Sequence, residues 1–257
     1  MSASGLQGRV VWITGASSGI GRALAKNLAE RGDRVAVSAR GEAALQSLAD
    51  ETAEAAGSVH PYPLDITDAA ACTETVDKIT SDLGTIELAV LNAGTHHPVE
   101  AEAFAADDLA ALIGINLLGT GNCLAPILER MIPARAGHIA IVASVAGYRG
   151  LPTSAYYGAS KAAQINLAEA LKFDLDRLGI KLQLINPGFV KTPLTDKNEF
   201  SMPFLLEVDD AAERMARGLE GSAFEVTFPR RFVYLLKCLR ILPYRLYFPI
   251  VRSMTGK

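Results

Sequence analysis

The sequence contains few of the residues that build disulfide frameworks or metal sites. Its 257 residues include three cysteines, Cys72, Cys123 and Cys238, and four histidines. The cysteines are odd in number and far apart, which favours reduced thiols in a cytosolic compartment over a set of disulfides. No two histidines are four residues apart, as they are in helical zinc sites, so we expect no metal. The adjacent His96 and His97 are expected to be solvated loop residues, with the lining of a pocket as the alternative.

Long hydrophobic runs are also scarce. The first apolar run, residues 10–13, has four residues and follows no basic segment, which fits a buried strand rather than a signal peptide or membrane span. We therefore expect a cytoplasmic protein. Hydrophobic residues nevertheless make up 49% of the chain and no linker-like segment divides it, so one domain with a large core is predicted.

Acidic residues are missing from the end of the chain. Residues 229–257 hold seven lysines and arginines and no aspartate or glutamate, whereas the whole chain has a formal net charge of −3. The remainder therefore has a net charge of −10, and such an acidic body argues against a nucleic-acid partner.

This basic segment begins with a helical pattern. Apolar residues recur at i, i+3, i+4 and i+7 and cations occupy the opposite face; the apolar residues are Phe232, Leu235, Leu236 and Leu239, and the cations are Arg230, Lys237 and Arg240. Pro243 and Pro249 are expected to interrupt a helix further on. Residues 229–257 therefore form a basic amphipathic extension. It can lie in an anionic membrane interface, cover the substrate pocket or contact a partner subunit.

Short runs rich in valine and isoleucine alternate with longer stretches rich in alanine, leucine, glutamate and lysine. The expected strands are 9–14, 34–38, 59–64, 86–91, 139–143, 182–185 and 224–228, and the expected helices are 20–31, 42–56, 69–83, 103–131 and 156–178. Right-handed crossovers place the helices of such a chain over both faces of a mostly parallel sheet. We predict an α/β domain, residues 1–228, with a doubly wound parallel sheet of about seven strands.

A glycine-rich segment, TGASSGIG (residues 14–21), follows the first strand and opens the first helix. Gly15, Gly19 and Gly21 allow a tight turn, let the backbone approach a pyrophosphate and let the helix pack on the strand. The N-terminus of that helix offers unpaired N–H groups to the anion. The alternative is a turn that merely reverses the chain. As a whole, the segment resembles the short-chain dehydrogenase/reductase family, which implies a Rossmann-like fold and a nicotinamide cofactor.

The second strand ends in Ser38-Ala39-Arg40, with no carboxylate to bind the ribose 2′-hydroxyl of NAD. An arginine at this point can pair with a 2′-phosphate and stack on adenine, so NADP(H) is the predicted cofactor, and Ser18 can donate a further hydrogen bond. The alternative is a solvated Arg40 beside a site that accepts NAD.

Three further segments match the family in order. LDITD, residues 64–68, implies adenine contacts by Asp65 and Ile66, although Asp65 can instead cap the next helix. The family's N-N-A-G segment is matched except that Leu91 replaces its first asparagine, and NPGFVKT, residues 186–192, resembles its P-G segment beside the nicotinamide. The resemblance implies that the cofactor is bound by Gly15, Ser17, Ser18, Gly19, Ile20, Gly21, Arg40, Asp65, Ile66, Asn92, Ala93, Gly94, Tyr157, Lys161, Pro187, Gly188, Val190 and Thr192.

Two tyrosines lie side by side in SAYYGASK, residues 154–161. Residues four apart share one face of a helix, so Tyr157 lies beside Lys161 while Tyr156 stacks over Ser160. A phenol has a pKa of about 10, and a nearby ammonium lowers it toward the range of a useful general acid. We therefore expect Tyr157 to be the reactive tyrosine and Tyr156 to be a packing or pocket-wall residue.

The family's Y-x-x-x-K signature falls on the same pair, with Ser144 thirteen positions upstream and Asn116 in GINLLGT. The resemblance implies that Tyr157 protonates a carbonyl oxygen as hydride leaves the nicotinamide, and that Ser144 hydrogen-bonds that oxygen. It also implies that Lys161 binds the nicotinamide ribose and lowers the tyrosine pKa, while Asn116 holds a water that links the lysine to solvent. The alternative for each residue is an incidental structural role.

Residues 189–208 match the family's substrate lid, and the part after Thr192 contains six large apolar residues: Leu194, Phe200, Met202, Phe204, Leu205 and Leu206. They favour an apolar substrate, unless they simply pack on the body. We thus expect an NADP(H)-dependent oxidoreductase acting on a carbonyl or secondary alcohol of an apolar, lipid-like molecule. Alternatives are a 3-oxoacyl thioester reductase, a non-catalytic NADP(H) sensor and a membrane-interaction protein. The resemblance also implies homo-dimers or homo-tetramers formed through the helices 103–131 and 156–178.

Overall fold

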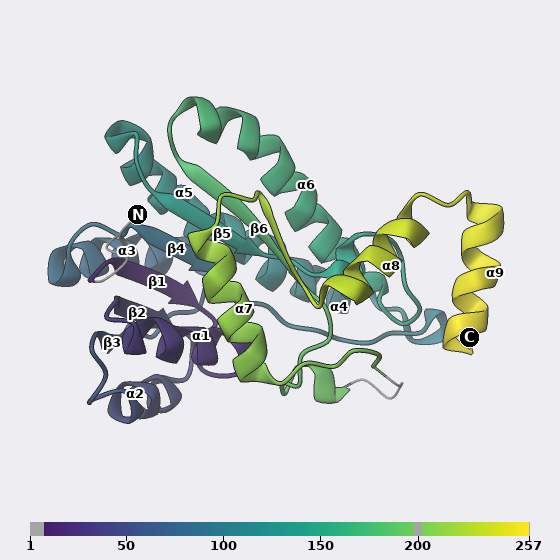
Figure 1. The fold of residues 1–257 in the computed structure, drawn as a ribbon, viewed down its shortest axis with the longest axis horizontal. Helices are drawn as coiled ribbons and strands as arrows, with labels where there is room; N and C mark the ends of the chain where they lie inside the picture. The colour runs from purple at the N-terminus through teal and green to yellow at the C-terminus, as the bar shows by residue number, and fades with distance from the viewer. Residues whose placement is uncertain (1–7, 198–201, 257) are drawn as a thin grey trace.

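Seven parallel strands form a single sheet in a computed structural model that describes residues 8–197 and 202–256 (Figure 1). Their order is β3-β2-β1-β4-β5-β6-β7. The strands are β1 (Val10–Thr14), β2 (Arg34–Ser38), β3 (Ser58–Pro61), β4 (Leu88–Leu91), β5 (His138–Val142), β6 (Lys181–Pro187) and β7 (Glu225–Phe228). The predicted doubly wound, Rossmann-like sheet is confirmed. Residues 1–7 of the predicted domain, Phe200 of the expected lid and Lys257 lie outside the described residues.

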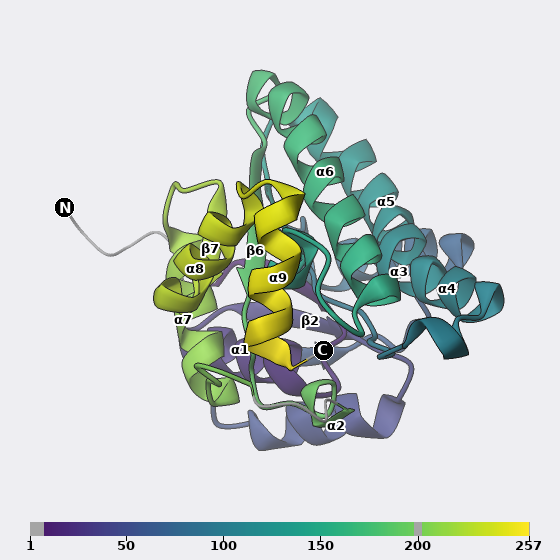
Figure 2. The same ribbon diagram turned by 90° about the vertical axis from the view of Figure 1, so that its right-hand side faces the viewer.

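Helices cover both faces of the sheet (Figures 1 and 2). One face carries α1 (Gly19–Glu30), α2 (Glu42–Glu51) and α7 (Val208–Glu220), and the other carries α3 (Ala69–Leu83), α5 (Gly119–Ala134) and α6 (Ala155–Arg177). Successive side chains of a strand point to opposite faces, so Val10 and Trp12 pack under the second group of helices while Val11 and Ile13 pack under the first. Strands buried on both faces explain the near-continuous apolar runs in the sequence.

The predicted helix 103–131 is interrupted. It consists of α4 (Ala106–Ile113), one π-helical turn, η2 (Gly114–Leu118), and α5. An 18-residue window within the stretch Ala106–Ala134 has a mean hydropathy of 1.6, so the stretch is long and apolar enough to cross a membrane by length and composition alone. Cys123, Ile127 and Met131 are buried in the core, so covering a sheet face accounts for its apolar character.

The carboxyl ends of the central strands define the site. The chain runs outward from β1 to β3 and then crosses back to β4 beside β1, so the strand order reverses between β1 and β4. In open parallel sheets, ligands bind at the crevice outside the strand ends at such a reversal. The glycine-rich segment follows β1 at this point.

The extension after β7 consists of two helices, α8 (Arg230–Arg240) and α9 (Tyr244–Thr255). The buried side chains of both belong to the apolar cluster under β5 and β6; they are Phe232, Val233, Leu236, Leu239, Tyr247 and Val251. Leu235, expected on the packed face, is 40% exposed. The expected interruption is confirmed at Pro243, which lies in the break between α8 and α9 and directly precedes α9. The interruption expected at Pro249 is wrong, because Pro249 lies inside α9 and removes only one helical hydrogen bond.

Candidate active site

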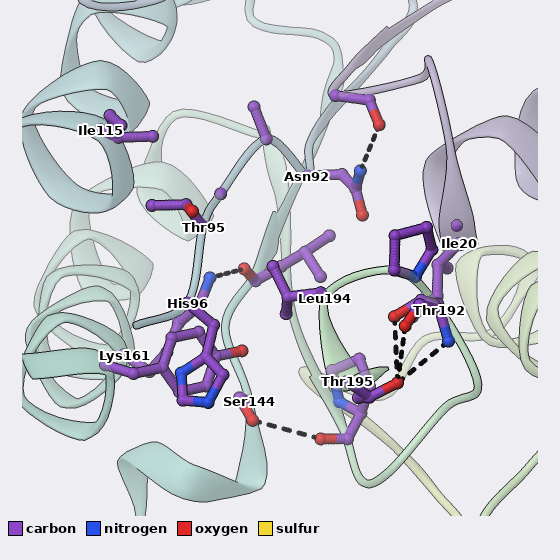
Figure 3. Close-up of a pocket in the computed structure, with 18 of the residues that line it drawn as sticks. Ile20, Asn92, Thr95, His96, Ile115, Ser144, Lys161, Thr192, Leu194 and Thr195 are labelled. Atoms are coloured by element: carbon purple, nitrogen blue, oxygen red, sulfur yellow. Dashed lines mark hydrogen bonds between the residues drawn. The ribbon is translucent and has the colours of Figure 1, made fainter. Parts of the chain in front are cut away.

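A cavity of about 860 Å³ opens at the carboxyl ends of the strands. Its walls are the glycine-rich loop, the segments that follow β2 to β6 and the first turns of α6. Figure 3 shows His96, Ser144 and Lys161 gathered on one side, with Ile20 and Thr192 across from them. One cavity therefore joins the anion-binding loop to the predicted catalytic segment.

The glycine-rich loop lies against the segment that follows β4. Gly15 has a φ of 71°, in the left-handed region, and a Cβ added to it would lie 2.7 Å from Ala93 Cα. A Cβ on Gly21 would lie 2.5 Å from Asn92 Nδ2. Only glycine allows this approach. The N-terminus of α1 then opens toward the cavity, and because the Ser18 side chain makes no capping bond, the first N–H groups of the helix are left for an anion.

Arg40 is exposed at the rim of the cavity, just beyond β2. Asp65 also lines the cavity, after β3. The pKa of Asp65 lies below its usual value, chiefly because its Oδ1 accepts the N–H and hydroxyl of Thr67 at 2.9 and 2.8 Å, with a smaller effect of the Arg40 charge. Asp68, not Asp65, caps α3, by accepting a main-chain N–H at 3.0 Å. The capping alternative for Asp65 is therefore wrong.

The segment Asn92-Ala93-Gly94 is fixed by the end of β1. Thr14 Oγ1 accepts the N–H groups of Asn92 and Ala93 at 3.0 and 3.1 Å, and Asn92 Nδ2 donates to Thr14 O at 3.0 Å. Leu91, which replaces the family's first asparagine, is buried in the core. These bonds hold the backbone of Gly94 beside Lys161, since a Cβ on Gly94 would lie 3.5 Å from the lysine Nζ.

Tyr157 and Lys161 lie one turn apart on α6, and both line the cavity. The lysine Nζ is 5.6 Å from the centroid of the Tyr157 ring. Tyr156 is fully buried elsewhere, where its hydroxyl accepts the Ala105 N–H at 2.6 Å and donates to the Ala105 carbonyl at 2.9 Å. Tyr156 is thus a packing residue, as predicted.

The pKa of Tyr157 is raised, against the expectation that Lys161 lowers it. Burial of the phenol is the main cause, and a hydrogen bond with Ser144 opposes it. Lys161 is 3% exposed, and burial lowers its pKa to about 7. A lysine with that pKa is only partly charged at neutral pH, so it contributes little to the acidity of the phenol. The four-residue spacing in the sequence shows that Lys161 lies beside Tyr157, but it does not show that both side chains are buried.

Asn116 lies in η2, behind the cavity wall. Its side chain accepts the Thr95 N–H at 2.7 Å and donates to Thr95 O and Ser160 Oγ at 3.0 and 2.9 Å. Its main-chain oxygen accepts from Gln164 Nε2 at 2.7 Å, and Gln164 Oε1 accepts from Lys161 Nζ at 2.8 Å. A glutamine side chain therefore joins the main chain of Asn116 to the lysine.

Ser144 follows β5 and faces Tyr157. Its hydroxyl accepts the Ala146 N–H at 3.1 Å and lies 3.5 Å from the Pro187 carbonyl (Figure 3). The first of these bonds begins the short helix η3 (Val145–Gly147), which packs on α6. Backbone geometry at the strand end thus aims the serine at the tyrosine.

Part of the lining is apolar, from the loop before α6, the segment after β6 and the helix α8: Leu151, Pro152, Phe189, Leu194 and Phe232. The Phe189 and Phe232 rings lie 5.3 Å apart. His96 adds a polar group, since it lines the cavity, is 8% exposed and has its ring centroid 4.8 Å from that of Tyr157. His97 is exposed. His96 therefore lines a pocket, which was the alternative, whereas His97 is a solvated loop residue, as expected.

The expected lid, residues 189–208, is paired at its base. The Lys191 N–H donates to Leu206 O at 2.9 Å, and the Leu206 N–H donates to Phe189 O at 3.0 Å. Beyond this bridge, Phe204 and Leu205 are 51% and 42% exposed. The segment thus combines residues that pack on the body with apolar residues that face outward.

All of the predicted catalytic and cofactor-binding residues line this cavity except Gly21 and Asn116. Gly21 packs the helix on the strand, and Asn116 supports the wall from behind. Several lining residues were not predicted, including Thr95, Ile115, Leu151, Pro152 and Phe232. Thr95 directly follows the Asn92-Ala93-Gly94 segment, so extending that motif by one residue would have found it. Phe232 lies beyond the family motifs, and its place in the lining agrees with the expectation that the extension can cover the substrate pocket.

Relatives place the chain in a family. Residues 9–201 match the family described as short chain dehydrogenase. An "uncharacterized oxidoreductase" of Myxococcus xanthus is 38% identical over 246 residues, covering 96% of this chain and 97% of that protein. The 3-oxoacyl-[acyl-carrier-protein] reductase FabG of Thermotoga maritima is 35% identical over 192 residues, covering 75% and 78%. The protein belongs to the short-chain dehydrogenase family of oxidoreductases.

Solved structures show the same fold. A short-chain dehydrogenase/reductase of Burkholderia phymatum in complex with NAD has a TM-score of 0.83 at 26% identity, covering 90% of this chain and 92% of that one. An actinorhodin polyketide ketoreductase variant with NADPH has a TM-score of 0.77 at 26% identity, covering 86% and 95%. The family uses nicotinamide cofactors. The residues present here fit one, because the glycine cradle and the N-terminus of α1 suit a pyrophosphate at one side of a cavity large enough for a dinucleotide.

Proposed function

We propose that this protein is an NADP(H)-dependent oxidoreductase that interconverts a carbonyl and a secondary alcohol on an apolar, lipid-like substrate. One observation carries the proposal: Ser144, Tyr157 and Lys161 line the same cavity as the glycine-rich loop. A proton donor and its partners therefore lie within reach of a dinucleotide held by that loop. When bound, the nicotinamide supplies or accepts the hydride.

Tyr157 is the proton donor in carbonyl reduction. Because burial raises the pKa of its phenol, the hydroxyl keeps its proton at neutral pH and can transfer it to a carbonyl oxygen. Ser144, hydrogen-bonded to that hydroxyl, donates to the same substrate oxygen and orients it. The same hydroxyl takes up the proton in alcohol oxidation, so the direction depends on the cofactor pool, and reduction is proposed because NADPH pools usually favour it.

Lys161 binds the nicotinamide ribose. An ammonium has three N–H donors, and two of them bond to the Val142 carbonyl and Gln164 Oε1, at 2.9 and 2.8 Å. The third is left for a ribose hydroxyl. Asn116 lies behind the cavity wall, where its two hydrogen bonds to Thr95 hold the backbone that follows Gly94.

The adjacent tyrosines provide a matched test of the mechanism. Tyr157→Phe removes the proton donor and should lower turnover by roughly a hundredfold or more while NADPH still binds. Tyr156→Phe removes a hydroxyl that bonds only to Ala105 among the described residues, so it should retain most activity. NADPH oxidation and fluorescence titration measure the two effects. Equal losses of turnover in both variants would refute the assignment.

The substrate proposal rests on the apolar residues of the cavity, among them Leu151, Leu194 and Phe232. A 3-oxoacyl thioester reductase is the second candidate, because the Thermotoga maritima relative is named as one. NADPH consumption measured with apolar ketones and with 3-oxoacyl thioesters distinguishes the two. Tight NADPH binding without turnover of any compound would favour a non-catalytic NADP(H) sensor.

The NADP(H) preference rests on Arg40. The end of β2 offers an exposed guanidinium and no carboxylate, which suits a 2′-phosphate. Ala39→Asp places a carboxylate there that accepts the 2′-hydroxyl of NAD(H) and repels a phosphate. We expect the ratio of NADPH to NADH affinity to fall at least tenfold, and Ala39→Ser, which adds no charge, should leave it within about twofold. An unchanged ratio in Ala39→Asp would remove the basis for the preference.

A further inference from the structure

Helix α9 exposes more apolar side chains than it buries. Tyr247 and Val251 pack on the body, whereas five large apolar residues are 39% to 69% exposed: Tyr244, Leu246, Phe248, Ile250 and Met254. Leu246, Ile250 and Met254 are spaced four residues apart and form one stripe along the helix. On the other side of the buried line, the rings of Tyr244 and Phe248 stack with centroids 5.6 Å apart. We call these five residues the α9 apolar surface.

The α9 apolar surface is bordered by positive charge. Arg245 and Arg252 are exposed on the same side of the helix, two turns apart, and α8 adds exposed Arg230, Arg231 and Arg240. No acidic residue occurs after Glu225 in the chain. Aromatic and aliphatic side chains beside arginines are the composition of helices that lie in a lipid interface, where the apolar groups insert and the guanidiniums meet phosphates.

The helix is held firmly on the body. Arg149 Nη1 donates to the carbonyls of Leu239, Arg240 and Leu242 at 2.9, 3.0 and 2.6 Å. Its guanidinium lies 3.9 Å from the Tyr247 ring centroid. The Tyr247 hydroxyl donates to the Gly150 carbonyl at 2.6 Å. The α9 apolar surface is therefore presented in a fixed orientation, from a loop that continues into the cavity lining at Leu151.

Exposed residues of the lid approach α8, the helix that precedes α9. Phe204 and Leu205 are exposed, and the Phe204 ring lies 6.1 Å from that of Phe232, which lines the cavity. In Figure 1, α9 lies beyond α8 at the right-hand end of the molecule. Apolar groups from two distant segments thus gather near the cavity.

We propose that α9, with Phe204 and Leu205, docks the protein on an anionic lipid surface. A second copy of the chain is a poorer occupant, because a two-fold interface through α9 would bring two arginine-rich helices that contain no acidic residue against each other. Lipid phosphates neutralise the same charges. The docking stands apart from the proposed reaction, although it would let an apolar substrate reach the cavity from the bilayer.

Vesicle flotation of the full chain tests the docking. We expect binding to vesicles of phosphatidylcholine mixed with phosphatidylglycerol at low salt, and about tenfold weaker binding to phosphatidylcholine alone. Arg245→Gln with Arg252→Gln should weaken binding to anionic vesicles roughly tenfold or more, since each arginine near such a surface contributes about 1 kcal/mol. Leu246→Ser, Ile250→Ser and Met254→Ser together should abolish it, whereas Phe173→Ser, at an exposed position on α6, should not.

Three results would overturn the docking: no flotation of the full chain, equal flotation of the triple variant, or a triple variant whose only change is a lower mass in solution, which would identify a second copy as the occupant. Melting temperatures of the variants verify that each is folded. NADPH turnover of a water-soluble ketone should stay within about twofold in all of them, because no substituted residue lines the cavity. Failure of turnover in every protein would refute the proposed function and leave the flotation result standing.

Gln164 carries a second, independent inference, which rests on the proposed function. Its side chain is fully buried on the far side of Lys161 from the cavity lining. Because lysine can only donate, Oε1 is the atom that accepts from Lys161 Nζ, and Nε2 must donate to Asn116 O and Thr120 Oγ1, at 2.7 and 2.8 Å. The amide orientation is thus determined by its partners.

We infer that Gln164 is a positioning residue that holds Lys161 in place and favours its charged form. The carbonyl oxygens of Val142 and Gln164 accept from the Nζ, which leaves its third N–H facing the cavity. The titratable groups nearest to it are Tyr157 on α6 and His96, which contacts the Tyr157 ring. No carboxylate contacts the Nζ among the described residues, so the Gln164 amide is the side-chain group that stabilises the ammonium.

Two near-isosteric variants separate this role from a structural one. Gln164→Met removes the acceptor, so Lys161 should lose its proton at lower pH and turnover at pH 8 should fall about tenfold. Gln164→Glu adds an opposite charge and should keep the lysine protonated to higher pH. The pH profile of kcat/KM should therefore move in opposite directions in the two variants. Profiles that stay in place while only the melting temperature falls would reduce Gln164 to a structural residue, and an active Tyr157→Phe variant would instead refute the proposed function.

Discussion

His138 carries a buried proton-sensitive contact between β5 and β6. Its Nε2 bonds to Gln183 Oε1 at 2.8 Å, while Gln183 Nε2 donates to the carbonyls of Gly218 and Ala223. Burial, together with the nearby charge of Lys181, lowers the pKa of His138 to about 3. The imidazole is therefore neutral in the folded protein across most of the pH range in which the unfolded chain binds a proton.

The low His138 pKa predicts that stability falls in mild acid. Below pH 6.5 the unfolded state gains a proton that the folded state lacks, so stability present above pH 6.5 is lost as the pH falls toward 3, by up to about 1.4 kcal/mol per unit from this group. Urea unfolding at pH 7.5 and pH 5 should show a smaller loss in His138→Gln than in the wild type. His97→Gln, at an exposed position, should match the wild type. Equal losses in all three proteins would contradict this origin.

Single residues were predictable where chemistry depends on spacing along one helix. The four-residue interval between Tyr157 and Lys161 is enough to place them together and to distinguish Tyr157 from Tyr156. The direction of the tyrosine pKa was not predictable, because it depends on burial that segments far away in the chain create around both side chains. Gln164 also had no sequence signal, since its partners Asn116 and Thr120 come from another helix.

At the scale of elements, the packing of η3 on α6 fixes where Ser144, the residue before η3, lies relative to Tyr157. Gly147, its last residue, packs so closely that an added Cβ would lie 2.7 Å from the Lys161 carbonyl carbon and 2.8 Å from Ala162 N. Gly147→Ala must therefore push η3 away from the helix and separate Ser144 from Tyr157. We expect NADPH-dependent turnover to fall roughly a hundredfold, as for displacements of about 1 Å in an active site.

Gly150 provides the control for that substitution. It lies three residues further along, and a Cβ there meets nothing within 4 Å, so Gly150→Ala should keep turnover within about twofold of the wild type. Comparable activity of Gly147→Ala and Gly150→Ala would show that the packing of η3 on α6 does not set the position of Ser144.

The predicted and observed bounds of an element agree where a single sequence pattern determines it. β2 and α3 have their predicted bounds, because apolar runs and the helical period were unambiguous there. β3 ends at Pro61 rather than residue 64, although the N–H groups of Tyr62 and Leu64 still donate to Val37 O and Ala39 O at 2.8 and 3.0 Å. Pro61 and Pro63 are tolerated there because β3 is the edge strand. The π-helical turn η2 broke the predicted helix 103–131, and no composition signal marks such a turn because its side chains are those of an ordinary helix.

At the scale of the whole molecule, the layers could be predicted but the surfaces left exposed could not. The alternation of strands and helices predicts a doubly wound sheet, because right-handed crossovers between parallel strands permit few arrangements of the helices. Whether the apolar residues of the basic extension face the core or solvent depends on the loop at Arg149, which receives the end of α8. The structure divides them, burying most of those on α8 and exposing most of those on α9.

We propose that copies of the chain associate through the exposed face of α6. Small residues follow one another along it, at Ala155, Ala159 and Ala162, and lead to Phe173, which is 82% exposed. Small side chains let two helices approach closely, and a large apolar residue at the end of such a face gains by burial against a partner. We therefore expect Phe173→Arg combined with Ala162→Arg to reduce an oligomer to the 27.3 kDa monomer in light scattering. Tyr234→Arg on α8, which is 65% exposed in a different region, should leave the mass unchanged. The reverse outcome would place the interface on α8.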